Sequence, residues 1–466
     1  MKSVCVKDIL NECGGKLIFG DLNAVCESFS KDTRTIEKGD IYLGIKGENF
    51  NGSDFYLDAL EKGAKGCILQ DIVINEQDVD EYKDRFVIVV EDVVKTIQRL
   101  AQYKRALYNI PVIGITGSVG KTSTKDMIAS VLGTKYTVLK TEGNYNNEIG
   151  LPLTILRLKE ENALVLEMGM SAKGEMSLLT SIARPTTAVI TIIGSSHIGE
   201  LGSRENILKA KLEMLEGLKK GSTVIINNDN DLLNKWNREC KDEFKHITYG
   251  IENDSQYNAK KITLFEDSSS FEIEYKEKNY LVKVPVGGVH FVYNSLAAIA
   301  VGIEYGVQMK DIIRGIETFS LTKRRMEILK LSGNITVVND SYNASYESIK
   351  AALEYINSTS SGRKIAVLGD VLELGDYSVK MHEEIGKEVI KNNVDVLITV
   401  GEEAKNINRV VRESDKNIEE YHFGNNQEAL KKLMLLMQEN DTILVKASNS
   451  MHFEEITDKL KENMGQ

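Results

Sequence analysis

The stretch Pro111-Val-Ile-Gly-Ile-Thr-Gly-Ser-Val-Gly-Lys-Thr-Ser-Thr124 decides the fold of this chain. It begins with an apolar run typical of a buried strand, breaks at Gly117 and Gly120, and continues into a helical pattern near Lys121. A strand, a glycine turn and a helix in this order point backbone N–H groups and the positive end of a helix at a phosphate. The stretch therefore predicts a nucleotide-phosphate site.

The residues of this turn have separate predicted roles. Lys121 would reach the terminal phosphates of a nucleotide, and the Thr122 hydroxyl would ligate magnesium. The other phosphate-binding candidates are Gly117, Ser118, Gly120 and Ser123. The strict G-x-x-x-x-G-K-[ST] pattern requires glycine at position 115, where this chain has Ile115, and Gly114 comes one residue early. Because Gly-Lys-Thr still follows a strand and opens a helix, an ordinary turn with a solvated lysine is the weaker alternative.

Composition narrows the class of protein. The chain has 466 residues, which is too long for one hydrophobic core and fits about two to four domains. Its net charge of −11 argues against nucleic acid or an anionic membrane as the main partner. Five scattered cysteines without a C-x-x-C pair fit reduced thiols. With no apolar N-terminal signal and no run of about 18 apolar residues, we expect a cytoplasmic protein without a membrane span.

Alternating strand and helix patterns predict an α/β protein. The predicted domains are residues 1–108, 109–322 and 323–466. The first is a small N-terminal unit with short strands near 41–45, 66–69 and 86–90. A helix over residues 93–108 leads from it into the domain that carries the glycine turn.

The central domain is predicted to hold a mostly parallel sheet. Apolar runs at residues 163–166, 187–193 and 222–226 alternate with helical patterns, and alternating segments near 262–285 predict an added hairpin. Ligands of such sheets bind beyond the carboxyl ends of the strands. Glu167 and His197 follow two of these strands, so we expect them at the same edge as the glycine turn.

A predicted helix over residues 205–218 carries two lysines, Lys209 and Lys211, off its apolar stripe. Helical spacing alone therefore predicts two solvated side chains.

The third domain is predicted to be an open, Rossmann-like α/β sheet. Its predicted strands lie near 336–338, 365–368, 394–400 and 442–445. Its predicted helices lie near 345–357, 378–392, 426–438 and 453–463. The pattern G-x-G-x-x-G is absent, so a nicotinamide cofactor is not indicated.

Several motifs in one order resemble the Mur ligases, the ATP-dependent amide ligases of peptidoglycan precursor synthesis. The motifs are Gly117-Ser-Val-Gly-Lys-Thr-Ser-Thr-Lys125, Asn144-Tyr-Asn-Asn-Glu-Ile-Gly-Leu-Pro152, Glu167-Met-Gly169 with Gly174-Glu175, and His197 with Ala210-Lys211. The resemblance covers all three domains, so it is more specific than the glycine turn alone. It implies that ATP phosphorylates a substrate carboxylate, and that an amine then attacks the acyl phosphate.

Two stretches of the third domain resemble the Mur ligases that join D-Ala-D-Ala to UDP-N-acetylmuramoyl-tripeptide. They are Asp340-Ser-Tyr-Asn-Ala344 and Val367-Leu-Gly-Asp-Val-Leu-Glu-Leu-Gly-Asp376, the second with His382. The resemblance implies that the first domain holds the UDP-muramoyl part, the second ATP and the third the dipeptide, closing like a lid. The substrate-binding residues that it implies are Thr33, Arg34, Lys46, Gly47, Asn146, Asn147 and Asn343.

The same resemblance implies a metal and nucleotide site. Glu167 and Thr122 would hold one magnesium ion and His197 a second, with Lys121 on the γ-phosphate. In the family the lysine that matches Lys211 is carbamylated, and such an N6-carboxylysine would be a further metal ligand. The implied nucleotide contacts are Asn294 with adenine, Arg325 with the ribose or phosphates, and Asp340 from the third domain.

Three alternatives stay open at this point. Departures at Asn343-Ala-Ser-Tyr346 and Lys446-Ala-Ser-Asn449 leave room for a Mur-type ligase that adds a single amino acid. Folylpolyglutamate synthase shares the ATP and C-terminal domains but lacks a separate front domain. A nucleotide-binding paralogue without ligase activity would have no need for the complete set of four site residues, Lys121, Glu167, His197 and Lys211. We expect a monomer.

Overall fold

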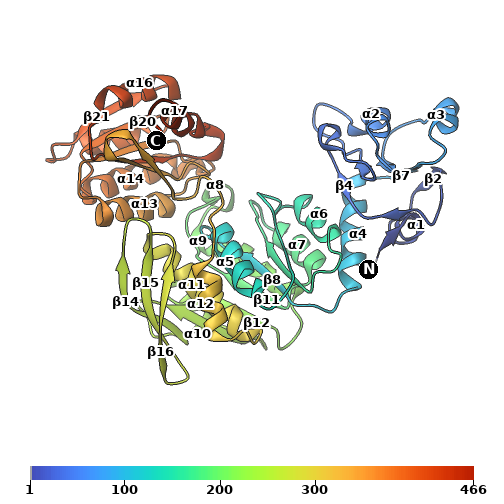
Figure 1. Ribbon diagram of the computed structural model, residues 1–466, viewed down its shortest axis with the longest axis horizontal. Helices are drawn as coiled ribbons and strands as arrows, with labels where there is room; N and C mark the ends of the chain where they lie inside the picture. Colours follow the sequence, from blue (N-terminus) through green and yellow to red (C-terminus); the bar gives the residue numbers. More distant parts are fainter. Residues whose placement is uncertain (1–2, 466) are drawn as a thin grey trace.

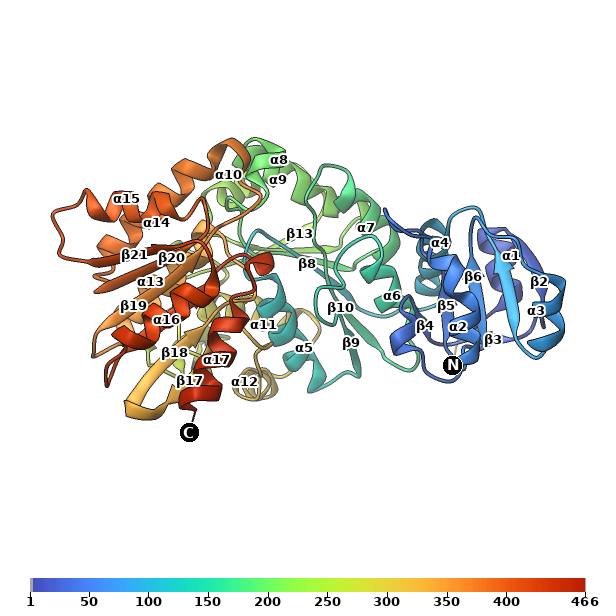
Figure 2. The same cartoon turned by 90° about the horizontal axis from the view of Figure 1, so that it is seen from above.

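The computed structural model describes residues 3–465. Its three larger sheets follow one another along the chain, and a two-stranded ladder lies near the N-terminus. The first and third units lie at opposite ends of the central unit, blue and red in Figure 1, and the view from above shows the same order (Figure 2). The predicted α/β fold with three units is confirmed, while the residue numbers of the boundaries stay predictions.

The first unit holds a five-stranded sheet in the order β2-β7-β6-β5-β4. Its strands are β2 (Lys16–Phe19), β4 (Phe29–Ser30), β5 (Ile41–Leu43), β6 (Gly66–Leu69) and β7 (Phe86–Val89), and the separate ladder pairs β1 (Val4–Cys5) with β3 (Val25–Cys26). Its helices are α1 (Val6–Cys13), α2 (Tyr56–Glu61) and α3 (Glu76–Glu81). The three predicted strands are confirmed. The strands β1 to β4 were not predicted, because two to four residues are too few to show a period.

Helix α4 (Val93–Ala106) follows the first unit and is attached to the central one. It packs on α6 (Gly150–Leu156) and α7 (Glu175–Ala183). Two buried cations hold it there: Lys104 Nζ donates to the Leu156 carbonyl oxygen at 2.8 Å, and Arg105 Nε donates to the Ala183 carbonyl oxygen at 2.9 Å. The helix therefore ties the small sheet to the body of the protein.

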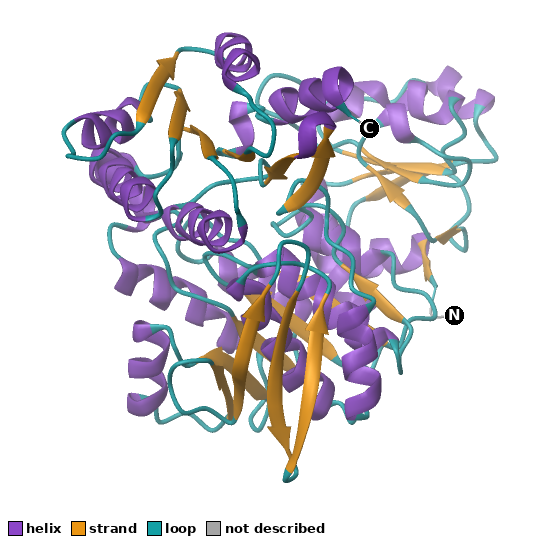
Figure 3. Ribbon diagram, turned by 60° about the vertical axis from the view of Figure 1, so that its left-hand side comes forward, coloured by secondary structure: helices purple, strands orange, loops and turns teal. Residues whose placement is uncertain are grey.

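The central unit holds nine strands in the order β16-β15-β14-β13-β12-β11-β8-β10-β9. They are β8 (Val112–Thr116), β9 (Val138–Lys140), β10 (Ala163–Glu167), β11 (Thr187–Ile190), β12 (Thr223–Asn227), β13 (Lys245–Gly250), β14 (Tyr257–Leu264), β15 (Ser269–Tyr275) and β16 (Lys278–Val284). The pairs from β9 to β14 are parallel, and β15 and β16 add antiparallel strands (Figure 3). The predicted parallel sheet with an added hairpin is confirmed.

Helices cover this sheet on both sides of its buried centre. Besides α6 and α7 they are α5 (Lys121–Gly133), α8 (Ile198–Leu201), α9 (Arg204–Leu212), α10 (Asp231–Glu239), α11 (Val289–Glu304) and α12 (Met309–Glu317). The single helix predicted over 205–218 is α9 followed by a 3₁₀ helix at Glu213–Gly217. All five residues of β8 are buried, which explains why Val112, Ile113 and Ile115 face no polar alternation.

The register of the central strands brings three strand ends to one edge. Glu167 at the end of β10 pairs with Ile115 of β8, and Ile190 at the end of β11 pairs with Thr116. Residues that follow these strands therefore lie beside the start of α5, where the sequence places the phosphate-binding turn.

The third unit holds six strands in the order β17-β18-β22-β19-β20-β21. They are β17 (Glu327–Leu331), β18 (Ile335–Asn339), β19 (Lys364–Gly369), β20 (Val396–Val400), β21 (Glu419–Phe423) and β22 (Thr442–Lys446). The helices are α13 (Tyr346–Thr359), α14 (Ser378–Lys391), α15 (Lys405–Arg412), α16 (Asn426–Leu436) and α17 (Glu454–Met464). The predicted elements are confirmed, whereas β17, α15 and β21 were not predicted. Within residues 3–465, no helix is long and apolar enough to cross a membrane.

Candidate active site

The phosphate loop, residues 117–123, is held against the end of β11. A Cβ atom on Gly117 would lie 1.9 Å from Thr191 Oγ1, so only glycine fits this approach. Thr191 Oγ1 in turn donates to the Val119 carbonyl oxygen at 2.6 Å. Gly120 has a φ of 85° and directly precedes α5, so the turn enters the helix through a left-handed residue. The helix start is thereby aimed at a bound anion.

Two cations meet at the phosphate loop. Lys121 Nζ donates to the Gly117 carbonyl oxygen at 2.9 Å, and Arg325 Nη2 donates to Thr122 Oγ1 at 3.1 Å. Burial lowers the pKa of Lys121, and the charge of Glu167 opposes this shift. Arg325 Nε is buried without a hydrogen-bond partner among the described residues. The loop therefore presents positive charge that an anionic ligand would neutralise.

The remaining predicted loop and adenine residues form hydrogen bonds within the central unit. Ser118 Oγ accepts from the Gly194 backbone N–H at 2.9 Å. Asn294 Oδ1, on α11, accepts from Thr124 Oγ1 at 3.0 Å. Ser123 is buried in the first turn of α5. These contacts place Asn294 and Ser118 at the loop, and their roles towards a nucleotide stay predictions.

Glu167 presents an unsatisfied carboxylate oxygen at the end of β10. The side chain is buried, and its Oε1 accepts from Asn146 Nδ2 at 2.8 Å. Its Oε2 has no hydrogen-bond partner within residues 3–465. Buried carboxylate oxygens are normally paired, so an orphan beside a phosphate loop is the donor that a divalent cation requires. Glu167 and the Thr122 hydroxyl therefore fit a magnesium ion.

Lys211 is buried, so the prediction of two solvated lysines from helical spacing is wrong for one of them. Lys209 is exposed, whereas Lys211 is 1% exposed. Its Nζ lies 3.6 Å from the Met170 sulfur, a weak acceptor. Burial, reinforced by the charge of Lys121, lowers the pKa of Lys211 well below its usual range. This amine is poorly placed as a cation and well placed as a neutral nucleophile.

His197 is joined to the third unit rather than to Glu167. It has a left-handed backbone with a φ of 64° and directly precedes α8. Its Nδ1 donates to Glu373 Oε2 at 2.7 Å, and this hydrogen bond lowers the pKa of Glu373. Glu373 follows β19, inside the stretch at 367–376 that the sequence singled out, but no role was predicted for it.

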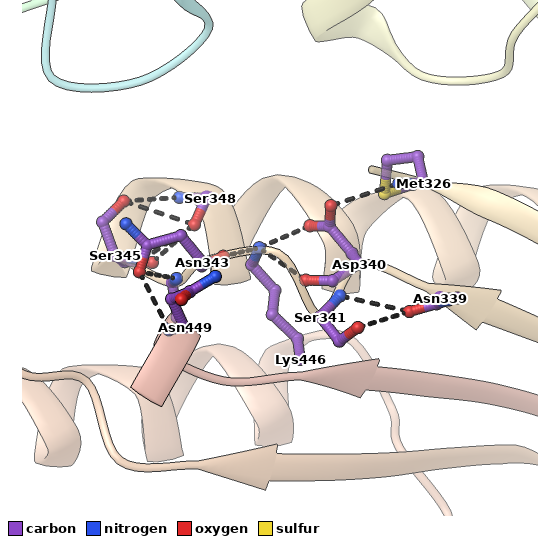
Figure 4. A network of polar contacts seen from close by, with 10 residues as sticks. Met326, Asn339, Asp340, Ser341, Asn343, Ser345, Ser348, Lys446 and Asn449 are labelled. Carbon is purple, nitrogen blue, oxygen red and sulfur yellow. Dashed lines mark hydrogen bonds and ion pairs between the residues drawn. The ribbon is translucent and has the colours of Figure 1, made fainter. Parts of the chain in front are cut away.

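Asp340 is held by the third unit's own residues (Figure 4). Its carboxylate forms an ion pair with the buried Lys446 and accepts from the Met326 backbone N–H at 3.1 Å. Lys446 Nζ also donates to the Asn343 carbonyl oxygen at 2.9 Å. The predicted nucleotide residue Asp340 and the predicted substrate residue Asn343 thus share one lysine.

Comparison with known proteins agrees with this geometry. Residues 115–302 match the Mur ligase middle domain, and residues 324–449 match the Mur ligase, glutamate ligase domain. The UDP-N-acetylmuramoyl-tripeptide--D-alanyl-D-alanine ligase of Bacillus subtilis (strain 168) is 38% identical over 94% of this chain and 94% of its own length. This chain belongs to the Mur ligase family.

Solved structures of Mur ligases share the whole architecture. Crystal structure I of MurF from Acinetobacter baumannii superposes with a TM-score of 0.89 at 27% identity and covers 99% of both chains. The MurF ligase from Thermotoga maritima, solved in complex with ADP, gives a TM-score of 0.81 at 29% identity and covers 94% of this chain and 97% of its own.

Two of the substrate residues predicted in the first unit of this Mur ligase, Arg34 and Lys46, are exposed and already paired. Arg34 forms a bidentate ion pair with Asp32, with N–O contacts of 2.6 and 2.9 Å, and its side chain is 85% exposed. Lys46 Nζ lies 2.9 Å from Asp71 Oδ2. Thr33 opens the 3₁₀ helix Thr33–Thr35 that also carries Arg34. These residues form a polar surface apart from the buried cluster of the central unit.

Two further predicted substrate residues have local hydrogen bonds. Gly47 donates its backbone N–H to the Phe50 carbonyl oxygen at 2.9 Å. Asn147 Oδ1 accepts from the Gly150 backbone N–H at 2.9 Å, at the start of α6. Asn147 therefore shapes the turn, while its neighbour Asn146 holds Glu167.

Sequence reasoning missed a contact between Glu347, on α13 of the third unit, and Ser195, which follows β11 of the central unit. Glu347 Oε1 accepts from the Ser195 backbone N–H at 2.7 Å, and its Oε2 accepts from Ser195 Oγ at 3.1 Å. Sequence patterns describe single elements, so they carry no signal for a pair that forms between two units.

A separate group of metal-ligating side chains lies between α10 and β13. Cys240, Asp242 and His246 offer ligand atoms within 4.8 Å of one another. The two ring nitrogens of His246 already lie 2.6 Å from Asn237 Oδ1 and 2.7 Å from Asp242 Oδ1. Hydrogen bonding within the chain accounts for this group.

Proposed function

We propose that this Mur ligase joins D-alanyl-D-alanine to UDP-N-acetylmuramoyl-tripeptide and converts ATP to ADP. The observation that carries the phosphoryl-transfer chemistry is the Oε2 of Glu167, unpaired among residues 3–465, at the sheet edge that also holds Lys121. The amine substrate is supported by the name of the Bacillus subtilis relative, which matches nearly the whole chain. A ligase that adds a single amino acid is the less favoured alternative.

The first step would form a bond between a carboxylate oxygen of the tripeptide and the γ-phosphorus, while the bond from that phosphorus to the β-bridging oxygen breaks and ADP leaves. Lys121 would neutralise the γ-phosphate, and Arg325 Nε, which has no hydrogen-bond partner in the described part of the chain, would meet a phosphate or ribose oxygen. Magnesium, held by Glu167 and Thr122 with a second ion on His197, would supply charge stabilisation between phosphate and carboxylate.

The second step would join the amine nitrogen to the activated carbonyl carbon. The bond from that carbon to the phosphate oxygen breaks, inorganic phosphate leaves, and the nitrogen releases a proton. Asn343 and its neighbours in the third unit would orient the dipeptide, while Thr33, Arg34, Lys46 and Gly47 would hold the UDP-muramoyl part. In this arrangement the protein works by alignment and charge neutralisation.

Carbamylation of Lys211, which the family resemblance implies, is supported by the surroundings of this side chain. A neutral amine attacks carbon dioxide, forms an N–C bond and loses a proton, which yields an anion with oxygen donors. That anion would balance Lys121 and bind magnesium. The low pKa of Lys211 and its thioether contact with Met170 support this assignment.

The proposal includes a monomeric cytoplasmic enzyme, in keeping with the five free cysteines of the described chain. The direct test of the reaction is phosphate release from ATP with UDP-N-acetylmuramoyl-tripeptide and a panel of amines. Turnover is expected with D-Ala-D-Ala. Turnover with single amino acids only would contradict the dipeptide assignment, and none with any amine would contradict ligation.

A further inference from the structure

Residues 373–377 of the third unit contact residues 197–202 of the central unit, the segment that carries His197. Glu373 contributes two contacts: its Oε2 accepts from His197 Nδ1 at 2.7 Å, and its carbonyl oxygen accepts from the Gly199 backbone N–H at 3.2 Å. Tyr377 Oη donates to the Gly202 carbonyl oxygen at 2.5 Å. One short segment of the third unit therefore contacts the central loop at three places.

These contacts are closely packed. A Cβ atom on Gly199 would lie 2.6 Å from the Gly375 backbone nitrogen, so the two backbones touch. Glu373 and His197 both have left-handed backbones, with φ values of 63° and 64°. Such conformations cost free energy in residues other than glycine and persist where the surroundings hold them. The packing of the two units therefore holds the backbones of Glu373 and His197 in place.

The chemistry of the pair fixes the tautomer of His197. An ionised carboxylate only accepts hydrogen bonds, so the proton of the neutral imidazole lies on Nδ1. The lone pair is then on Nε2, the other ring nitrogen. Histidines that bind metals usually donate their second nitrogen to a carboxylate or carbonyl in this manner.

We propose that Glu373 is a positioning residue that orients His197 with Nε2 free for a divalent cation, so that docking of the third unit completes the cation site. This inference rests on the proposed function, in which His197 holds a cation. It assigns a residue of the amine-binding unit to the metal chemistry of the ATP-binding unit.

Binding of Mn²⁺ to the intact protein tests the inference without turnover. Mn²⁺ is titrated by electron paramagnetic resonance in the presence of a non-hydrolysable ATP analogue. The variants are E373A, E373Q and H197A, with Y377F as the matched control that removes a contact between the same two segments. Glu373 is 63% exposed, so its replacement should leave the fold intact, as thermal unfolding would verify.

The expected result is that E373A weakens one Mn²⁺ site by about 10–100-fold, as loss of such supporting partners does elsewhere. E373Q should restore most of this affinity because the amide oxygen still accepts from Nδ1, and Y377F should leave it unchanged. H197A should weaken the same Mn²⁺ site. The double variant H197A/E373A should bind Mn²⁺ at that site no more weakly than H197A alone. If H197A loses the site and E373A keeps it, the inference is overturned while the proposed function stands. If H197A itself keeps every site, the cation role of His197 is wrong and the inference falls with it, while phosphate release still decides whether the protein is a ligase.

Discussion

The buried cluster around Lys121 and the exposed surface around Arg34 differ in what shifts the pKa values of their charged side chains. Burial lowers the pKa values of Lys121 and Lys211, the second reinforced by the charge of the first. In the first unit, Asp71 raises the pKa of Lys46, and the hydrogen bonds from Arg34 lower the pKa of Asp32 to about 2. Within residues 3–465 neither Lys121 nor Lys211 forms an ion pair, whereas Lys46 and Arg34 are already paired with carboxylates.

This difference separates two kinds of binding. A substrate anion that enters the buried cluster relieves an existing electrostatic cost, at a low dielectric where each charge acts strongly. A substrate anion at Arg34 or Lys46 must replace a carboxylate that water already screens, so each contact there contributes little. We therefore expect variants of the buried cluster to have large effects and variants of the exposed surface to have small ones.

The largest effect is expected for Lys211→Ala. It should lower kcat by about 10²–10³-fold, comparable to loss of a key group that stabilises transition-state charge. Short-chain carboxylates should restore part of the activity, because they return an anion to the vacated space. The control is Lys209→Ala, an exposed lysine two residues earlier on α9. Equal activity of the two variants, measured as phosphate release, would exclude a role for the buried amine.

Breaking the buried ion pair of the third unit comes next. Lys446→Met leaves the Asp340 carboxylate without its buried partner and should lower the free energy of unfolding by about 3–5 kcal/mol. The control is Lys459→Met, which removes an exposed pair with Glu462 in the same unit and should change the free energy of unfolding much less. Urea denaturation followed by circular dichroism measures both, and equal losses would show that the pair behaves as a surface pair.

His290 makes the stability of the folded protein depend on pH. Burial lowers its pKa to about 4, while Asp340 raises it and Lys446 lowers it further. Because the unfolded chain takes up this proton more readily, stability is complete above about pH 6.5 and falls as pH decreases towards 4, by at most about 3 kcal/mol. His290→Phe should flatten this part of the profile, and His452→Phe, at an exposed histidine, should not. An unchanged profile in His290→Phe would refute the assignment.

The smallest effect is expected for Arg34→Ala. It should raise KM for the UDP-linked substrate by about tenfold or less and leave kcat nearly unchanged, since an exposed, already paired guanidinium contributes little to binding. Its thermal stability should match that of Lys83→Ala, an exposed lysine of the same unit. A large loss of kcat would place Arg34 with the buried cluster and undo the comparison.

Features that depend on the general geometry of parallel sheets could be predicted from the sequence. Features that depend on contacts between distant side chains or units could not. The phosphate loop and Glu167 could be placed because parallel strands end together at one edge. The burial of Lys211 could not, because the Met170 side chain that it contacts belongs to another part of the chain. The pair between Glu373 and His197 depends on how two units dock, and no local pattern encodes that. The family resemblance supplied roles for these residues that spacing alone could not.

Gly117 has a consequence for how chains of this fold are compared. Its lack of a side chain is demanded by Thr191 of the neighbouring strand end, whether or not a nucleotide is bound. A relative that had lost its catalytic activity would still need this glycine, because the phosphate loop packs against the neighbouring strand end. A relative that keeps this glycine therefore shows that it keeps the fold. Whether it is still an active enzyme is better judged from the residues that match Lys121 and Lys211.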